Sequence, residues 1–417
     1  MIGEFAVKPR FQGGGSSHIN CHRVTSLMDA LAGTPGVQYA QGYRIDSDQP
    51  EEALEEEALR AAAAADKALL VIGLPERAES EGYDRAHIDL PANQNRLVEK
   101  VAAVNPNVIV LLYNGAPVAM PWVGLARGLV EGYLAGQNVG EANRRVLWGE
   151  VSPSGRLPES FPLRLEDTPC YLSYGGEGNR CVYNEGVFVG YRYYTRKKMP
   201  VLFPFGAGLS YTTFAYGTPR LDKTEMDDTD TLTVSVDVTN TGSMPGKEVV
   251  QLYVAPAPCG VFRPVRELKA FGKVDLQPSE TKTVTLTLSK RAFAYWNTDI
   301  HDWYVESGEY AIQLCRSAEE VICSAPVTVR STRALPLTVT EDTVICDLAR
   351  DPKKLALYRR LQGQAREEDE SEAGQEAITK AMREATGNYA PLRHSLCFGG
   401  EMTHAKLKEI IDALNQA

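Results

Sequence analysis

Three carboxylates and one arginine lie within seven consecutive residues, Glu79-Ser80-Glu81-Gly82-Tyr83-Asp84-Arg85. Neighbouring carboxylates push each other's pKa values apart, and a general acid needs a raised pKa. Arg85 could hold Asp84 ionised, and Gly82 gives the backbone freedom to turn beside the acid. From spacing alone, two interpretations stay open: an acid/base loop of an enzyme, or an exposed acidic loop.

The surrounding pattern places this stretch directly after a predicted strand, Ala68–Leu74. Other apolar runs predict strands at Ile2–Phe5, Val37–Tyr43, Val108–Tyr113 and Leu129–Leu134, with helices at Leu54–Ala65, Asn93–Val104 and Glu141–Gly149. Apolar strands that alternate with helices indicate a parallel sheet covered on both faces. In such sheets the loops after the strand C-termini form the ligand crevice, so the carboxylates lie at the functional edge.

A second stretch, KPRFQGGGSSH from Lys8 to His18, follows the first predicted strand. A glycine triplet can cradle an anion through backbone N–H groups. Lys8 precedes the glycines, so the stretch is neither a Walker loop nor a GxGxxG fingerprint. It favours a loop that walls the same crevice, with His18 as a hydrogen-bonding loop residue.

The rest of the chain changes character twice. Residues 166–216 are rich in Gly, Tyr and Pro and indicate a long connector. Residues 217–330 predict an antiparallel β-sandwich from short alternating runs at Leu232–Val238, Val249–Val254, Thr281–Leu288 and Glu309–Leu314. Residues 331–417 form a partly helical tail, with an acidic run at 367–372 and helical patterns at about 373–384 and 403–415.

Composition narrows the partners. The net charge of -10 disfavours nucleic acid, which needs a basic face, and is compatible with a neutral sugar. The eight cysteines contain no CxxC pair, which favours free thiols over zinc; a Cys170–Cys181 or Cys315–Cys323 bridge is the alternative. No ligand cluster suggests a metal or an organic cofactor. No signal peptide or membrane-length apolar run is visible, so the expected location is cytoplasmic.

Several stretches, collinear over residues 1–330, resemble the C-terminal region of family 3 glycoside hydrolases. The matching pieces are IGEFAVKPRFQGGGSSHIN (2–20), ESEGYDR (79–85), LPANQ (90–94), NGAPVAMPW (114–122), GQNVGEANRRVLWGEVSPSGRLPESFP (136–162), YNEGVFVGYRYY (183–194), FPFGAGLSYTTF (203–214) and NTGSMPGKEVVQLYV (240–254).

The resemblance implies an α/β sandwich domain at 1–165 and a fibronectin type III-like domain at 217–330. It also implies retaining hydrolysis of β-glycosides, commonly β-glucosides. Glu81 matches the family's acid/base, and Glu79 is the alternative. The same loops imply a substrate-binding set, which is Tyr83, Asp84, Arg85, Arg10, Phe11, Gln12 and Ser16.

The chain departs from the family in one respect. The family's nucleophile is an aspartate on a TIM barrel, which needs about 250 residues, and no segment here reads as eight βα units. Retention requires two carboxyl groups about 5–5.5 Å apart. We therefore expect an enzyme fragment that is inactive alone, with a solvated Glu81 of ordinary pKa, about 4.3.

Two other interpretations stay open. One is a split enzyme whose barrel lies on another polypeptide, and the other is a non-catalytic sugar-binding or scaffolding module. Homodimer formation also stays open, and the sequence does not fix the preferred sugar.

Overall fold

The computed structural model describes residues 1–361, 377–397 and 402–417. The chain divides into two units, Met1–Thr332 and Arg333–Ala417. The first unit contains an α/β region, an irregular connector and a β-sandwich, and the second is helical. The predicted fold class is therefore confirmed: a parallel-sheet α/β region is followed by a β-rich region.

The α/β region is built on three parallel strands in the order β1-β2-β3. They are β1 (Ala68–Gly73), β2 (Val108–Tyr113) and β3 (Gly128–Glu131). β1 and β2 are apolar at nearly every position, and their side chains are buried on both faces of the sheet. A strand that faces water on one side would alternate instead.

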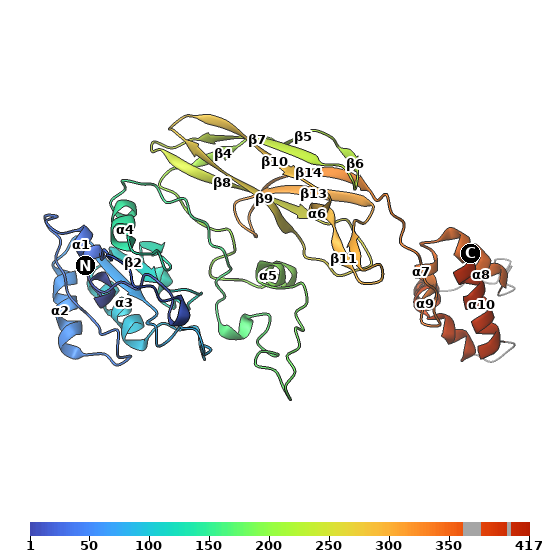
Figure 1. Cartoon of the computed structure of the whole chain (residues 1–417), viewed down its shortest axis with the longest axis horizontal. Helices are drawn as coiled ribbons and strands as arrows, with labels where there is room; N and C mark the ends of the chain where they lie inside the picture. Colours follow the sequence, from blue (N-terminus) through green and yellow to red (C-terminus); the bar gives the residue numbers. More distant parts are fainter. Residues whose placement is uncertain (362–376, 398–401) are drawn as a thin grey trace. The chain divides into compact units, whose positions relative to one another are not determined.

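Two helix pairs cover this sheet. α1 (Leu27–Ala30) contacts α4 (Val139–Leu147), and α2 (Glu52–Ala63) contacts α3 (Ala92–Val104). Figure 1 shows the two pairs on either side of the strands, and side chains of both pairs join one hydrophobic core. The predicted helices thus exist, with ends shifted by at most two residues.

The first two predicted strands are wrong as strands. Ile2 forms only single parallel bridges, to Leu70 and to Ala40, and Glu4–Ala6 is a 3-10 turn, η1. Gly3 lies at φ 127°, and a Cβ there would approach the Val71 carbonyl oxygen to 2.2 Å. The backbone therefore crosses close to β1 and turns away instead of pairing along it.

The predicted strand Leu129–Leu134 is also too long. β3 ends at Glu131, and the next two residues turn the chain away from the sheet. Tyr133 has φ 46°, a left-handed conformation that is costly for a bulky side chain. The turn leaves the Glu131 side chain at the C-terminal edge of the sheet.

The β-sandwich consists of two sheets. One has the order β10-β7-β4, with β5 also on β7, and the other has the order β6-β14-β13-β8-β9. Their bounds are β4 Phe214–Tyr216, β5 Arg220–Leu221, β6 Glu225–Asp227, β7 Leu232–Asn240, β8 Gly246–Ala255, β9 Glu267–Leu276, β10 Thr281–Leu288, β13 Gly308–Cys315 and β14 Val321–Arg330. A short helix, α6 (Lys290–Phe293), precedes a hairpin of β11 (Tyr295–Asn297) and β12 (Asp302–Tyr304).

All four strands predicted here are present as β7, β8, β10 and β13. In β7 every second side chain is buried, as the LTVSVDV alternation predicts. β9 and β14 were not among the strands predicted from the sequence.

The connector contains a short helix that its composition concealed, α5 (Tyr191–Lys197), and the 3-10 helix η4 (Leu165–Asp167) lies at its start. A further 3-10 helix, η3 (Val123–Leu125), lies earlier, in the α/β region. The Tyr191 ring stacks on Phe205 with ring centroids 4.7 Å apart, and its hydroxyl accepts a hydrogen bond from the backbone N–H of Leu268. Tertiary packing on the β-sandwich thus holds a helix in a Gly- and Tyr-rich segment that has little helical pattern of its own.

The C-terminal unit has its own small core of Val339, Leu348, Tyr358, Leu392, Leu407, Ile410 and Leu414. Its helices are α7 (Ile345–Leu348), α8 (Pro352–Leu361), α9 (Ala377–Tyr389), η6 (Leu392–Leu396) and α10 (His404–Gln416). The predicted helix at 403–415 is confirmed, and Thr403 caps it by accepting from the Lys406 N–H. The acidic run at 367–372 lies outside the described residues.

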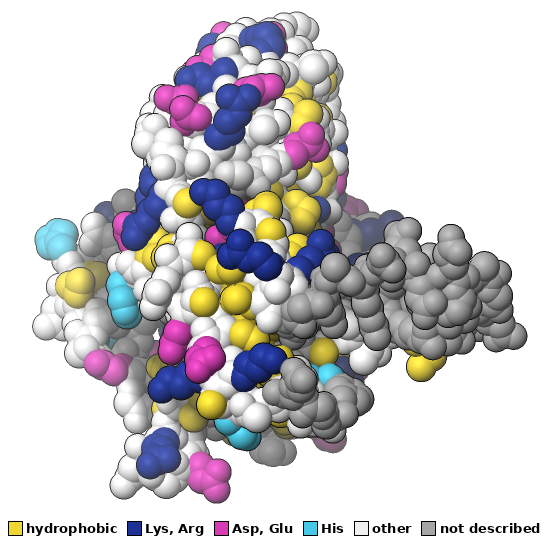
Figure 2. Space-filling model, turned by 90° about the vertical axis from the view of Figure 1, so that its right-hand side faces the viewer, with side chains coloured by type: hydrophobic (Ala, Val, Ile, Leu, Met, Phe, Trp, Pro, Cys, Tyr) yellow, Lys and Arg dark blue, Asp and Glu magenta, His cyan; other side chains and the backbone are white. Residues whose placement is uncertain are grey.

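On the face that Figure 2 shows, Lys and Arg side chains are interspersed with Asp and Glu, so the charges of its described residues are mixed in sign. All eight cysteines are free thiols, as predicted, and neither of the two bridges considered from the sequence forms. In the described part of the chain, no helix is both long enough and apolar enough to cross a bilayer.

Candidate functional site

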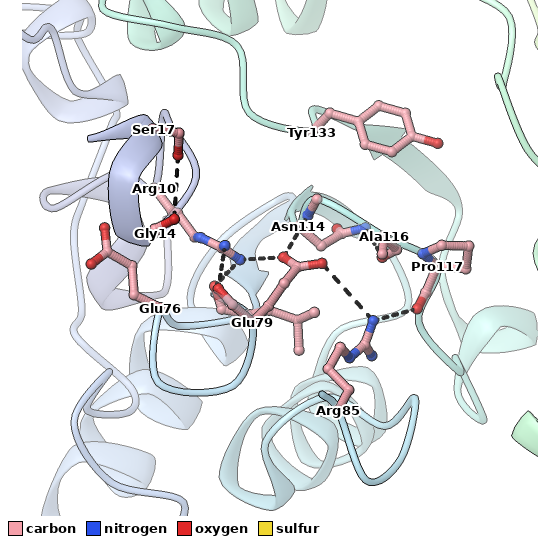
Figure 3. A network of polar contacts seen from close by, with 12 residues as sticks. Arg10, Gly14, Ser17, Glu76, Glu79, Arg85, Asn114, Ala116, Pro117 and Tyr133 are labelled. Atoms are coloured by element: carbon pink, nitrogen blue, oxygen red, sulfur yellow. Dashed lines mark hydrogen bonds and ion pairs between the residues drawn. The ribbon is translucent and has the colours of Figure 1, made fainter. Parts of the chain in front are cut away.

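The loop after β1 carries the candidate catalytic residues, and Glu79 fixes its base. One carboxylate oxygen of Glu79, Oε2, accepts from Arg10 Nη1 at 2.5 Å and from the backbone N–H of Gly115 at 2.8 Å. The other, Oε1, lies 4.0 Å from Arg85 Nη1. Figure 3 shows Glu79 between the two guanidinium groups, so this carboxylate is committed to holding the loop.

Arg10 is the counterpart of Glu79 and is 5% exposed. It also donates to two backbone oxygens of the loop, from Nη1 to Leu74 O at 3.0 Å and from Nη2 to Glu79 O at 2.9 Å. A guanidinium group presents several donors in a rigid plane, which suits this kind of multiple contact. Arg10 therefore joins the first loop of the chain to the loop after β1.

Glu81 is bound differently, at the exposed tip of the loop. Its Oε2 accepts from the backbone N–H of Ser16 at 2.5 Å. A Cβ on Gly15 would come within 2.5 Å of Glu81 Cβ, and one on Gly14 within 2.6 Å of Ser80 Oγ. The glycine triplet thus lets the two loops touch, and the backbone N–H of Ser16, directly after the triplet, binds the Glu81 carboxylate.

Hydrogen bonds from Ser16, by its hydroxyl and by its backbone N–H, lower the pKa of Glu81 below the usual value of a glutamate. The sequence predicted a solvated glutamate with an ordinary pKa. The departure arises because a hydrogen bond to the charged form favours that form. In this chain Glu81 is therefore ionised at neutral pH, whereas a general acid must carry a proton.

Of the three residues after Gly82, Tyr83 and Asp84 are exposed, whereas the Arg85 side chain is largely buried. The Tyr83 hydroxyl donates to the Glu76 carbonyl oxygen at 2.5 Å, which leaves the ring half-exposed. Asp84 Oδ1 accepts from the hydroxyl of Tyr174 in the connector at 2.6 Å. Arg85 Nη1 donates to the Pro117 carbonyl oxygen at 3.0 Å, across the gap between the loops that follow β1 and β2.

The remaining predicted residues shape the first loop. The Gln12 side chain bonds both the N–H and the carbonyl oxygen of Ile19, which closes the loop on itself. Phe11 packs half-buried against the α/β core. His18 lies exposed with its Nε2 3.6 Å from Glu76, in agreement with its predicted role as a loop residue. Ser16 alone of this set contacts Glu81, and the substrate contacts of all seven binding residues stay a prediction.

Two further carboxyl groups near Glu79 were missed from the sequence. Burial raises the pKa of Glu131 to about 8, against the opposing effect of hydrogen bonds from Tyr133 N–H and Asn114 Nδ2. Burial and the negative charge of Glu79 raise the pKa of Glu159. Glu131 ends a strand of the same sheet, so the edge rule that located Glu81 could also have located it.

This edge also holds buried polar atoms that have no partner among the described contacts: Arg10 Nε, Arg85 Nη2, Asn114 Oδ1 and Tyr133 Oη. Buried polar groups usually find partners, so such a concentration at one edge is unusual. A hollow of about 180 Å³ lies on the Arg85 side of the loop, lined in part by Tyr83, Asp84 and Arg85, and Glu81 is not among its lining residues. Within the described residues, no group of three or more His, Cys, Asp or Glu side chains is arranged to hold a metal ion.

The described chain thus combines a parallel sheet that has an exposed carboxylate on its C-terminal edge with a β-sandwich that follows it. Residues 1–211 match the glycosyl hydrolase family 3 C-terminal domain, and residues 248–318 match a fibronectin type III-like domain. The chain therefore belongs to glycosyl hydrolase family 3.

Similar proteins support this family assignment. Thermostable beta-glucosidase B of Acetivibrio thermocellus is 44% identical over 100% of this chain and 55% of its own length. An exo-alpha-(1->6)-L-arabinopyranosidase of Bifidobacterium breve is 48% identical over 77% of this chain and 42% of its own length. The crystal structure of the Bifidobacterium adolescentis GH3 beta-glucosidase superposes with a TM-score of 0.79 at 44% identity, covering 84% of this chain and 52% of the other. This chain thus spans about half the length of the relatives that it matches.

Proposed function

We propose that this chain supplies the acid/base half of a retaining glycosidase site, with Glu81 as the acid/base. The observation that carries the proposal is the division of labour in one loop. Glu79 is tied to Arg10 and Gly115, whereas Glu81 stands exposed with Ser16 as its partner. Of these two glutamates, Glu81 is the one free to approach a leaving-group oxygen.

No segment of residues 1–417 is long enough to form a TIM barrel beside the domains already described. We therefore propose that the nucleophile comes from a barrel domain outside these residues. A retaining site needs its two carboxyl groups about 5–5.5 Å apart, on opposite sides of the glycosidic bond. In the first step the nucleophile attacks the anomeric carbon while Glu81 gives its proton to the leaving oxygen. In the second step Glu81 takes a proton from water, which attacks the glycosyl-enzyme.

The lowered pKa of Glu81 is consistent with an incomplete site. A facing wall would exclude water and add a second negative charge, and both effects raise the pKa of a carboxyl group. We expect the chain alone to lack glycosidase activity because its proton donor is ionised and its nucleophile is absent. The binding set Tyr83, Asp84, Arg85, Arg10, Phe11, Gln12 and Ser16 is proposed to border the substrate, with Tyr83 presenting its half-exposed ring.

The test joins this chain to the part of the Acetivibrio thermocellus enzyme that it does not match. Hydrolysis is measured with aryl β-glucosides and aryl α-L-arabinopyranosides, because the named relatives act on different sugars. Glu81→Gln should lower turnover of substrates with poor leaving groups by about 10²–10⁴, and a 2,4-dinitrophenyl leaving group should shrink the effect on glycosylation because it needs no proton.

The matched control is Glu76→Gln, the same change on an exposed side chain of the same loop, and it should retain activity. An equal loss of kcat/KM, which reports the glycosylation step, for good and poor leaving groups would mean that Glu81 does not protonate the leaving group. Turnover by the unjoined chain, abolished by Glu81→Gln, would overturn the proposed dependence on a second domain.

A further inference from the structure

The connector between residues 170 and 190 exposes an unusual amount of apolar surface. Leu172 is 98% exposed and Tyr183 is 77% exposed, and Tyr171, Tyr174, Val182, Val187 and Val189 are exposed as well. None of these side chains belongs to a hydrophobic core of the described structure. Figure 1 draws the stretch that leads into α5 as an irregular ribbon. Contiguous exposed apolar residues of this kind mark interaction sites.

The segment is long for a structureless connection. Its order comes from turns, from the two hydrogen bonds between Glu177 and Arg180, and from glycines with positive φ. Loops longer than about 12–15 residues without secondary structure are uncommon in compact domains and are usually functional. Glu185 Oε2 is buried without a partner among the described contacts, so the segment offers an unmet acceptor as well as apolar side chains.

One hydrogen bond links this surface to the candidate active site. Tyr174 donates to Asp84, three residues from Glu81. A partner that covered the connector would therefore lie next to the acid/base loop. The unpaired atoms of Arg85 and Tyr133 belong to the same loop network and its neighbouring strand end. The exposed connector is thus linked through Asp84 to the loop that carries Arg85.

We propose that residues 170–190 are a docking surface for the part of a family member that this chain does not span. That part is large enough, because the chain covers 55% and 42% of the lengths of the relatives described above. The inference rests on the proposed function, since it makes the partner that covers the connector the one that brings the nucleophile to Glu81. The segment carries charges of both signs, so apolar contact rather than steering by charge should dominate binding.

The test co-expresses this chain with a tagged version of the unmatched part of the Acetivibrio thermocellus enzyme. We expect the two to co-purify. The variant Leu172→Ser/Tyr183→Ser/Val187→Ser should weaken the complex at least about tenfold. The matched control, Phe271→Ser/Trp296→Ser/Val321→Ser, removes three exposed apolar side chains of the β-sandwich and should bind as the wild type does. Circular dichroism checks that both triple variants keep the fold.

Hydroxyl-radical footprinting supplies the second measurement. Leu172 and Tyr183 should react readily in the chain alone and be protected in the complex, while Phe271 reacts equally in both. If the tagged part does not fold, the aligned segment of the intact Acetivibrio thermocellus enzyme is footprinted instead. Equal binding by the connector variant, high reactivity of the segment in the complex or in the intact relative, or self-association lost in that variant would overturn the proposal.

The outcomes separate docking from catalysis. A complex that depends on Leu172, Tyr183 and Val187 but shows no glycosidase activity would keep the docking surface and sink the proposed function. Activity that depends on Glu81 and is unaffected by the connector variant would support the proposed function and overturn the docking surface.

Discussion

The base and the tip of the loop after β1 hold the same kind of side chain in opposite ways. At the base, Glu79 is largely buried and is bound by Arg10 and Gly115, with Arg85 nearby. At the tip, Glu81 is exposed, and within the described residues its carboxylate is bound by Ser16. Two glutamates separated by one serine thus do different work. The base is a fixed platform, and the tip is a carboxylate whose protonation can still be set by what faces it.

Replacing Glu79, at the base of the loop, should have the largest effect on the free energy of unfolding. Glu79→Leu leaves the buried Arg10 without its counter-charge and the Gly115 N–H without an acceptor. Removal of one partner of a buried ion pair costs about 3–5 kcal/mol of unfolding free energy. Glu76→Leu on the same loop, at an exposed side chain, should cost within about 0.5 kcal/mol. Urea unfolding of both variants measures the difference, and similar losses would show that base and tip are not distinct.

The buried side of the edge should also respond to pH. The pKa of Glu131 is about 8 in the folded chain and lies near 4.5 when unfolded. Between these values the folded state binds a proton that the unfolded state has released, so stability falls as pH rises. One such group contributes about 1.4 kcal/mol per pH unit within this window.

Glu131→Gln should therefore flatten the pH dependence of stability between about pH 5 and pH 8. Urea unfolding at several pH values checks this, with Glu150→Gln as the control at an exposed, ion-paired glutamate whose pKa is lowered. An unchanged slope in Glu131→Gln would show that this carboxyl group is ionised in the folded protein, and that the buried edge is less distinct from the tip than its geometry indicates.

The sequence predicted those features of the loop that follow from hydrophobic periodicity and from motifs. Apolar strands of the right length located the sheet edge, and the motif resemblance singled out Glu81 over Glu79. The sequence did not predict the contacts that hold Glu79, because they come from Arg10 and Gly115, which are 69 and 36 residues away along the chain. The sequence wrongly predicted a strand at Ile2–Phe5, because the close crossing of Gly3 over β1 depends on tertiary contacts.

The tail and the connector show the same limit. The helix at 403–415 has a strong period and a threonine cap, both of which are local, and it was predicted within one residue of its bounds. α5 has neither signal and exists through contacts of Tyr191 with residues more than ten positions away. The domain boundaries at 165, 216 and 330 stay predictions, although the structure divides after Thr332.

The smallest expected effect sharpens the description of the tip. Ser16→Ala removes the hydroxyl that helps to hold Glu81 ionised, so the pKa of Glu81 should rise toward 4.5 while the backbone N–H keeps part of the shift. A ¹³C NMR titration of the glutamate carboxyl groups follows this change, with Glu81 assigned by its loss in Glu81→Gln. The free energy of unfolding should hardly change, because both groups are exposed. Ser17→Ala is the neighbouring control, since its hydroxyl donates to Gly14 O instead. If both variants leave the titration of Glu81 unchanged, the contact with Ser16 does not set its protonation, and the tip is as free as an ordinary surface glutamate.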